Sequence, residues 1–347
     1  MKRILPLILV VVLVLSLGLT GCAKEGSTQP QGDSNQGGSS QGEKVVLNMS
    51  VTSASGSTWE KGALYFADLV KERTNGMIEI NVYPNEQLSG GNQGKGVEML
   101  MSGATDLSYH SNIIYSIMDE RFGVISLPFL FSSVEDVDAA LAGAGGEAIN
   151  KILLEKNVVG LGFGENGYRQ LTNSKRPIEK LEDMKGLKIR IPGMKMYTSL
   201  FRALGADPLT MNFAEVFTAL QQGTIDGHEN PIDTIYSAKI HEVQKYLTMW
   251  DYSYDAIILG MNKDRFESFD AETQQILLEA GKEACEYQKK INRELADEQI
   301  EIFKEAGMEI NVLPEEAKGP FREAVQSVYE EYEPIMGAEL IELFRGK

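Results

Sequence analysis

Hydrophobic and polar residues alternate along several short segments of the chain, and longer segments without proline lie between them. Alternation with a period of two is typical of half-buried strands. It predicts strands at residues 44–51 and 187–191, and further strands are predicted at residues 77–83, 104–111, 158–163, which is a glycine-rich buried strand, and 206–210. The longer segments predict helices at residues 59–73, 93–101, 134–141, 147–156 and 194–204, and the first of these follows cap-forming residues. Strands that alternate with helices in this way are typical of an α/β fold.

The last third of the chain is predicted to be mostly helical. Residues 271–305 contain no proline and a single glycine, Gly281, so they predict one very long helix that can bend at that glycine. Residues 318–344 add glutamate-rich helix whose charges are expected to face solvent. The strand-like segment at residues 243–260 carries three aromatic residues spaced two apart, which either line a cleft or only pack: Trp250, Tyr252 and Tyr254.

Arg190 stands near the end of the strand predicted at residues 187–191. The odd positions of this segment are aliphatic, so Arg190 is expected to point away from the core face. Pro192 ends the strand because it has no N–H to donate. Ligands of α/β sheets bind beyond the carboxyl ends of strands, where a planar guanidinium can bind a carboxylate through two hydrogen bonds. The alternative is a solvated arginine in a surface salt bridge.

The N-terminal segment predicts export. Two basic residues precede an apolar run at residues 4–19, which is short for the alternative, a transmembrane anchor. The letters LTGC at residues 19–22 resemble a bacterial lipoprotein box, which implies removal of residues 1–21 as a signal peptide and a lipid on Cys22. Residues 22–43 are expected to be a flexible tether, because their composition cannot form a core. The protein is therefore expected outside the cytoplasm, lipid-anchored to the cell membrane, in the periplasm or on the outer cell face.

Composition restricts what this chain can bind. It has 33 basic and 50 acidic residues and a net charge of −17, so nucleic acid and anionic lipid headgroups are not expected as partners. A small anion is not excluded, because screening weakens distant charges whereas an arginine in a cleft acts in contact. Apart from Cys22, Cys285 is the only cysteine and is predicted to pack as a small apolar residue. The roughly 300 residues left after export exceed one compact core and favour two lobes.

No feature of the sequence predicts an enzyme, a metal site or a cofactor. The only histidines, His110, His228 and His241, lack the spacing of a metal motif. There is no G-x-S-x-G motif and no histidine in a triad-like context. Glu229 is expected to orient a neighbouring arginine, with a general base as the alternative. We therefore predict a binding protein, and an exported hydrolase or lyase is the less favoured hypothesis.

Five motifs resemble those of one receptor family. They are GMIEINVYPNEQL at residues 76–88, LPFLF at 127–131, GLKIRIP at 186–192, FAEVFTALQ at 213–221 and TIDGHENP at 224–231. Together they are similar to the extracytoplasmic solute receptors of TRAP transporters, of the dicarboxylate-receptor (DctP) type. The resemblance implies an α/β, two-lobed, periplasmic-binding-protein-like fold, with a ligand cleft between the lobes and a long helix backing both. We assign residues 44–166 and 256–295 to lobe 1, and residues 167–255 and 296–347 to lobe 2.

The resemblance also implies most of a ligand site. Arg190 matches the arginine that binds the ligand carboxylate bidentately, and Arg169 matches a second, more variable arginine. The whole set expected to contact the ligand is Arg190, Arg169, Asn230, Phe213, His110, Ser111, Tyr109 and Trp59. Residues expected behind these are Glu229, His228 and Tyr254.

Particular positions of this set remain open or depart from the family. Trp59, in the first turn of a helix after a loop of small hydroxyl residues, is either a wall of the site or a core residue. His228 replaces the usual glutamine, and Gly193 replaces a frequent asparagine, so any contact from that asparagine is lost or replaced. Ser111 stands where the receptor for an acidic nine-carbon sugar carries a carboxylate, which argues against that substrate.

The function implied is capture of a small organic acid and its delivery to the small and large membrane subunits of a TRAP transporter. The ligand is left open among a C4-dicarboxylate, a sugar acid and another hydroxy acid, with a slight preference for a hydroxylated acid. The alternative partner is an ATP-driven importer or a sensor kinase.

Overall fold

The structure is a computed structural model, and it describes residues 44–345. Its strands are β1 (Val45–Val51), β2 (Ile78–Tyr83), β3 (Leu107–Ser111), β4 (Val158–Tyr168), β5 (Gln170–Asn173), β6 (Lys188–Ile191), β7 (Asp207–Thr210), β8 (Gly227–Asn230), β9 (Tyr246–Met249), β10 (Tyr254–Asn262) and β11 (Glu309–Val312). Its α-helices are α1 (Thr58–Arg73), α2 (Gln93–Met101), α3 (Asn112–Tyr115), α4 (Val134–Ala142), α5 (Ala144–Glu155), α6 (Lys195–Ala203), α7 (Phe213–Gln221), α8 (Ile232–Ser237), α9 (Lys263–Glu267), α10 (Ala271–Glu305), α11 (Gly319–Ala324), α12 (Gln326–Met336) and α13 (Ala338–Glu342). The predicted α/β class is confirmed.

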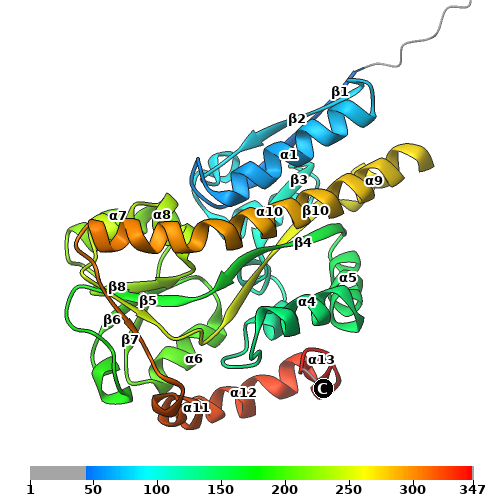
Figure 1. Ribbon diagram of the computed structural model, residues 1–347. Coiled ribbons are helices and arrows are strands. Elements are labelled where there is room, and N and C mark those ends of the chain that lie inside the picture. Colours follow the sequence, from blue (N-terminus) through cyan, green and yellow to red (C-terminus); the bar gives the residue numbers. More distant parts are fainter. Residues whose placement is uncertain (1–43, 346–347) are drawn as a thin grey trace, which may run out of the picture. The chain divides into compact units, whose positions relative to one another are not determined.

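Two β-sheets organise the described residues (Figure 1). The first sheet has the strand order β2-β1-β3-β10-β4, and the second has the order β11-β9-β5-β8-β6-β7. In the first sheet β1 is parallel to β2 and β3, whereas β10 is antiparallel to β3 and β4. In the second sheet β6 is parallel to β7 and β8, whereas β5 is antiparallel to β8 and β9. β6, the strand of Arg190, is therefore an internal strand.

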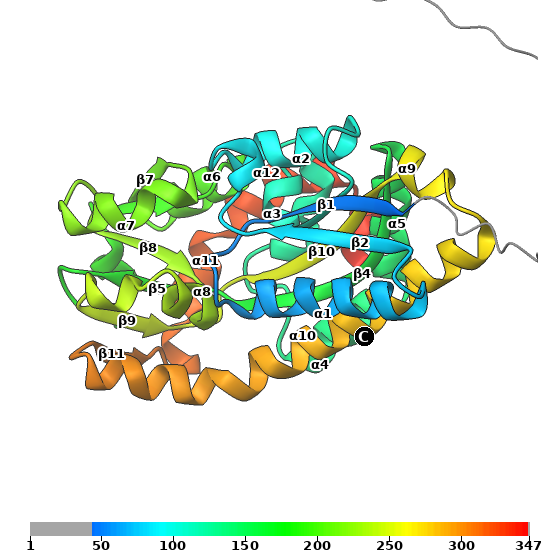
Figure 2. The same cartoon turned by 90° about the horizontal axis from the view of Figure 1, so that it is seen from above.

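The chain passes between the sheets along two adjacent strand segments (Figure 2). β4 ends at Tyr168 in the first sheet and β5 begins at Gln170 in the second, so that Arg169 lies at the crossing. The predicted crossing, near residues 164–167, is slightly earlier, because residues 164, 165 and 167 still pair with β10. The return passage, residues 250–253, joins β9 to β10. Both passages bring polar residues to the boundary between the sheets.

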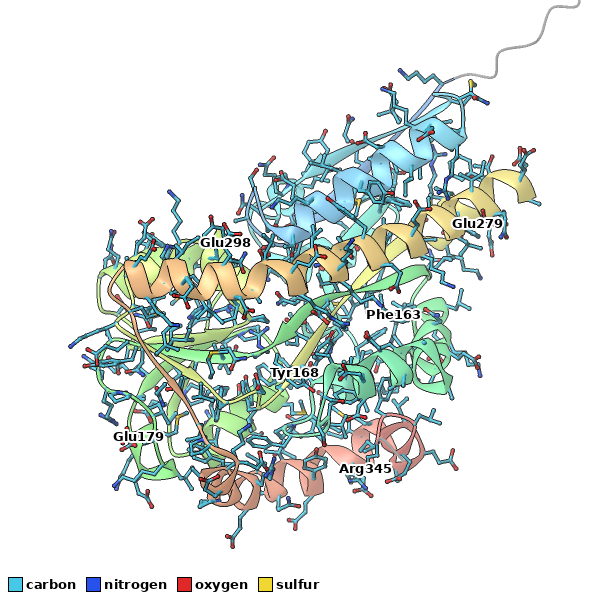
Figure 3. The ribbon with its side chains drawn as sticks, in the orientation of Figure 1. Phe163, Tyr168, Glu179, Glu279, Glu298 and Arg345 are labelled. Atoms are coloured by element: carbon cyan, nitrogen blue, oxygen red, sulfur yellow. The ribbon has the colours of Figure 1, made fainter. Side chains whose placement is uncertain are left out.

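The long helix predicted at residues 271–305 is confirmed as α10, which has 35 residues. It packs along β4 of the first sheet and along α1, which covers that sheet, and it reaches α8 beside the second sheet. Gly281 serves close packing, because a Cβ there would lie 2.7 Å from Leu161 Cβ and 2.8 Å from Leu161 O. The opposite face of α10 carries exposed charges such as Glu279 and Glu298 (Figure 3).

Buried hydrophobic residues form clusters around each sheet. One cluster packs α1 and α10 onto the first sheet, and another packs α7, α8 and the end of α10 onto the second. The largest cluster joins the remaining face of the first sheet to α6 and the C-terminal helices. Cys285 is buried among the residues under α10, as predicted from its helical context. Within residues 44–345, no helix combines the length and the apolar character needed to cross a membrane.

Trp250, Tyr252 and Tyr254 pack in the core. The rings of Trp250 and Tyr252 have centroids 4.3 Å apart, and Tyr254 contacts the ring of Tyr168 edge-on at 5.3 Å. All three are at most 1% exposed. The alternative that these residues line a cleft is therefore excluded.

Candidate ligand-binding site between the two sheets

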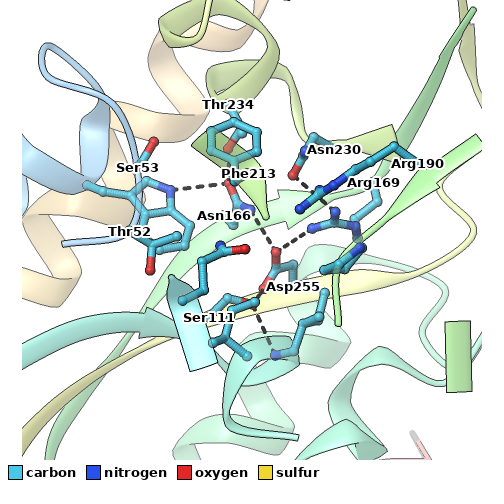
Figure 4. Close-up of a pocket in the computed structure, with 15 residues that line it drawn as sticks. Thr52, Ser53, Ser111, Asn166, Arg169, Arg190, Phe213, Asn230, Thr234 and Asp255 are labelled. Atoms are coloured by element: carbon cyan, nitrogen blue, oxygen red, sulfur yellow. Dashed lines mark hydrogen bonds and ion pairs between the residues drawn. The ribbon is translucent and has the colours of Figure 1, made fainter. Parts of the chain in front are cut away.

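A polar pocket lies where elements of the two sheets meet. It is lined by Thr52, Ser53, Trp59, Gln93, Ser111, Ile113, Ile114, Asn166, Arg169, Arg190, Pro192, Phe213, Asn230, Thr234 and Asp255. Arg190, Arg169 and Asn230 gather on one side, and Thr52 and Ser53 lie across from them (Figure 4). The space not filled by protein atoms is about 360 Å³ including the opening. Most of the expected ligand-contacting residues are thus brought to one pocket.

Arg190 is a buried cation without an acidic partner. Ile189 and Ile191 of β6 are buried on either side of it, and Arg190 itself is 1% exposed. Its Nε and Nη2 donate to Met211 O at 3.0 and 2.7 Å, and no carboxylate within residues 44–345 forms an ion pair with it. Burial lowers the pKa of Arg190 to about 9, because desolvation penalises the charged form. The surface salt bridge considered for Arg190 is excluded.

Arg169, in the same pocket, is surrounded by acceptors. Its Nε and Nη2 donate to the carboxylate of Glu229, and Nη2 also reaches Glu229 O at 2.8 Å and Asn230 Oδ1 at 3.0 Å. Its Nη1 donates to Asp255 Oδ2 at 2.5 Å. Burial opposes the charge, but Glu229 and Asp255 outweigh it and hold the pKa of Arg169 well above its usual value. Arg169 is therefore a neutralised cation that fixes two carboxylates.

Asp255 joins both sheets to this network. Its strand β10 belongs to the first sheet, and its carboxylate accepts from Ser111 Oγ and from Asn166 Nδ2 at 2.7 Å in addition to Arg169. Burial raises the pKa of Asp255, and the nearby charge of Arg169 opposes that rise. The carboxylate is held by three donors, so it is positioned rigidly at the pocket wall.

Asn230 and Phe213 complete the wall beside Arg190. Asn230 ends β8 and its amide oxygen accepts from Arg169, whereas its Nδ2 is buried without a partner among the described residues. The ring of Phe213, the first residue of α7, lies 5.7 Å from the Arg190 guanidinium carbon. An aromatic face at this distance attracts a cation weakly without providing a hydrogen-bond acceptor. The guanidinium thus keeps capacity for an anion.

The residues expected behind the site lie in the surrounding core. Glu229 binds Arg169 and accepts from Tyr252 Oη at 2.7 Å. His228 neighbours Arg190 in the sheet, and its Nδ1 lies 2.7 Å from Thr172 Oγ1. Burial, reinforced by the two arginines, holds the pKa of His228 well below its usual value, so it is neutral at pH 7. Tyr254 Oη donates to Glu165 Oε2 at 2.9 Å and does not line the pocket.

Trp59 and Ser111 line the pocket from the side of the first sheet. Trp59 is 2% exposed and belongs to the core cluster under α10, and its Nε1 donates to Asn166 Oδ1 at 3.2 Å. Trp59 is therefore a core residue that also lines the pocket, and its contact with a ligand stays a prediction. Ser111 is the last residue of β3, where its Oγ accepts from Ile113 N at 3.0 Å and donates to Asp255.

Tyr109 and His110 do not line the pocket, contrary to their expected place beside the ligand. Both lie within β3, so their side chains point to opposite faces of the sheet and only Ser111 reaches its end. Tyr109 points toward α10, with Oη 3.7 Å from Cys285 Sγ. His110 Nε2 lies 2.6 Å from Glu86 Oε1 in a buried pair. Among residues 44–345, no group of three acidic, histidine or cysteine side chains is arranged to hold a metal ion.

Hydrogen bonds between the elements of the two sheets border the pocket. Asp233 of α8 accepts from the backbone N and the Oγ1 of Thr58, which begins α1, at 3.0 and 2.9 Å. Asn166 Oδ1 accepts from Trp59 and, at 2.7 Å, from Thr234 Oγ1. The bonds from Thr58 to Asp233 and from Thr234 to Asn166 connect residues more than 60 positions apart and hold the two sides of the pocket together.

Several residues of the pocket were not predicted. They are Thr52, Ser53, Gln93, Ile113, Ile114, Asn166, Pro192, Thr234 and Asp255. The loop of small hydroxyl residues before α1 is the signal for Ser53, because hydroxyl groups ahead of a helix N-terminus form a natural anion-facing loop. A single acidic residue in the apolar run of β10 was the signal for Asp255, since a buried carboxylate needs a partner.

The structure has two β-sheets covered by helices, a polar pocket between them and a long helix that packs beside both. This arrangement defines a two-lobed solute-binding fold. The chain belongs to the bacterial extracellular solute-binding proteins of family 7, the DctP family, whose profile matches residues 49–334. The predicted resemblance to TRAP solute receptors is thereby confirmed. The protein is an extracytoplasmic solute receptor and not an enzyme.

Named relatives and a solved structure agree with this assignment. The chain is 34% identical to the 2,3-diketo-L-gulonate-binding periplasmic protein of Escherichia coli K12, over 71% of this chain and 74% of the relative. It is 31% identical to the C4-dicarboxylate-binding protein of Bacillus subtilis, over 86% and 85%. A crystal structure of a TRAP periplasmic solute-binding protein from Ralstonia eutropha H16, with bound (S)-2-acetolactate, has a TM-score of 0.84 and 34% identity and covers 87% of this chain and 98% of that one.

Proposed function

We propose that this protein captures a small organic acid in the pocket between the sheets and that Arg190 binds the acid's carboxylate. The observation that carries the proposal is a fully buried guanidinium that lines a pocket without an acidic partner. An unpaired buried charge costs several kcal/mol, and a ligand carboxylate offsets that cost through two charge-assisted hydrogen bonds. The ligands in the names of the relatives are all carboxylic acids.

The ligand would be enclosed by closure of two lobes. We assign residues 44–166 and 256–295 to lobe 1, and residues 167–255 and 296–347 to lobe 2. The bonds from Thr58 to Asp233 and from Thr234 to Asn166 would then form only in the closed state. A ligand that touches both lobes stabilises that state by its differential affinity.

The loaded receptor would deliver its acid to the membrane subunits of a TRAP transporter. Membership of the family supports this partner, and it gives no support to the alternative, an ATP-driven importer or a sensor. Cys22 lies outside the described residues, and we propose that it carries the lipid anchor with residues 22–43 as tether. Mass spectrometry of the exported protein tests the anchor, because a mature chain that lacks a diacylglyceryl group on Cys22 contradicts it.

The carboxylate contact is tested by calorimetry of Arg190→Ala with the acid that gives the largest thermal shift in a screen of organic acids. Loss of a buried charged contact commonly costs about 2–5 kcal/mol, so the affinity should fall at least tenfold. Arg202→Ala is the matched control, because Arg202 is an exposed arginine of α6 outside the pocket. An unchanged affinity in Arg190→Ala would remove Arg190 from the site.

A further inference from the structure

The two sides of the pocket differ in the groups they leave free. On the Arg190 side, the guanidinium and Asn230 Nδ2 lack acceptors among the described residues, other than Met211 O for the guanidinium. On the opposite side, Ser53 Oγ is buried without a partner, and the Gln93 side chain forms no hydrogen bond within residues 44–345. Ser53 is 2% exposed and Gln93 7%. One side therefore offers a positive charge with donors, and the other offers only uncharged polar groups.

The charges of the pocket admit one carboxylate. Among residues 44–345, Arg169 and Arg190 are the only basic residues that line it, and Arg169 is already matched by Glu229 and Asp255. Arg190 is therefore the single unmatched charge. A second carboxylate on the ligand would lie near Ser53 and Gln93 without a cation, and an unpaired buried carboxylate is strongly unfavourable.

The wall behind Ser53 also opposes a second negative charge. Thr52 Oγ1 donates to the buried carboxylate of Glu86 at 2.7 Å, and Glu86 is paired with His110. Among the described residues, no lysine or arginine is available on this side of the pocket to bind another anion. A hydroxyl or keto oxygen, in contrast, can exchange hydrogen bonds with a serine hydroxyl and a glutamine amide at no cost in charge.

We infer that the ligand is a monocarboxylate whose far end carries uncharged hydroxyl or keto groups, and that Ser53 and Gln93 select it against dicarboxylates. This inference rests on the proposed function, because it assumes that Arg190 holds the carboxylate. Ser53 comes from the loop after β1, and Gln93 comes from the first turn of α2. The first-sheet side of the pocket therefore determines the specificity, whereas the second sheet provides the positive charge of Arg190.

The test is calorimetry of the mature protein against two sets of acids of four to six carbon atoms. The monocarboxylates are D-erythronate, 2-acetolactate and D-gluconate, and the dicarboxylates are succinate, L-malate and 2-oxoglutarate. The best monocarboxylate should bind at least tenfold more tightly than the best dicarboxylate. A dicarboxylate that binds as tightly or more tightly overturns the inference and leaves the proposed function standing. Failure of all six acids to bind overturns both.

Variants of the far side sharpen this test. Ser53→Ala and Gln93→Leu should each lower the affinity for the best monocarboxylate about five- to tenfold, because a hydroxyl group of the ligand loses its hydrogen-bond partner. The same substitutions should change the affinity for succinate by less than twofold. Gln93→Lys supplies a second cation and should raise the affinity for succinate relative to that for the monocarboxylate. Ser55→Ala, an exposed neighbour outside the pocket, is the control. Equal losses for both classes of acid in the Ser53 and Gln93 variants overturn the assignment of specificity.

Discussion

Arg169 and Arg190 lie in the same pocket and are almost equally buried, at 3% and 1% exposure, but their surroundings differ completely. Arg169 meets two carboxylates, a backbone carbonyl and an amide oxygen. Arg190 meets one backbone carbonyl and an aromatic ring. The difference separates a cation that belongs to the fold from a cation reserved for a ligand. Burial alone does not distinguish the two, whereas the count of acidic partners does.

The same contrast appears in the direction of the pKa shifts. Desolvation acts on both guanidinium groups, but Glu229 and Asp255 raise the pKa of Arg169 above its usual value, whereas at Arg190 the charge of Glu229 offsets burial only in part and the pKa stays lowered. In the absence of ligand, Arg190 therefore weakens the fold, whereas Arg169 stabilises the carboxylates around it. The two positions should respond to the same substitution with opposite signs.

The largest effect is expected from Arg169→Met. This change leaves Glu229 and Asp255, which are 0% and 1% exposed, buried without their cation. Removing one partner of a buried ion pair commonly lowers the free energy of unfolding by about 3–5 kcal/mol. Urea denaturation of the variant and the wild type measures this difference. Arg121→Met is the control, because Arg121 forms partly exposed pairs with Asp119 and Glu155 that contribute about 1 kcal/mol or less.

A compensated variant keeps the Arg169 prediction testable if the single variant does not fold. Arg169→Met combined with Glu229→Gln and Asp255→Asn removes the two orphaned charges together with the arginine. Most of the lost stability should return in this triple variant. If the triple variant is as unstable as the single one, Arg169 acts by packing and the electrostatic comparison with Arg190 fails.

A smaller effect of opposite sign is expected from Arg190→Met. The variant removes a buried charge that lacks an acidic partner, but it also leaves Met211 O without its two donors. The loss of that hydrogen bonding costs about 1–3 kcal/mol and offsets part of the gain, so we expect a net rise of roughly 1 kcal/mol in the ligand-free protein. In excess ligand the wild type should gain stability and the variant should not. Destabilisation by more than about 2 kcal/mol would show that Arg190 is structural.

The sequence predicted the Arg190 side of the pocket better than the opposite side. Alternation in GLKIRIP is a local signal, and it fixes which face of β6 the arginine takes. The positions at the end of β3 depend on which residue is the last of the strand, and alternation then assigns Tyr109 and His110 to opposite faces. An error of one or two residues in the predicted end of β3 is enough to assign the wrong side chain to the pocket. The local pattern of hydrophobic and polar residues does not fix that end so closely.

Long-range pairing explains why the remaining site residues were missed. Asp255 approaches Arg169 only because β10 pairs with β4, and Asn166 reaches Thr234 and Trp59 only once the chain has crossed between the sheets. These contacts join residues from about 70 to more than 100 positions apart. The fold class and the long helix, in contrast, follow from local features such as the absence of proline in residues 271–305.

The pH dependence of ligand binding compares the two arginines in the intact protein. The charged guanidinium of Arg190 is the form that binds a carboxylate, and its pKa without ligand is about 9. The affinity should therefore be constant between pH 7 and 8, halve near pH 9 and fall about tenfold by pH 10. Arg169 cannot cause this fall, because its carboxylate partners keep its pKa well above the usual value. Calorimetry at each pH, with circular dichroism to verify the fold, measures the profile, and a flat profile to pH 10 would show that Arg190 is better solvated or better paired than its surroundings indicate.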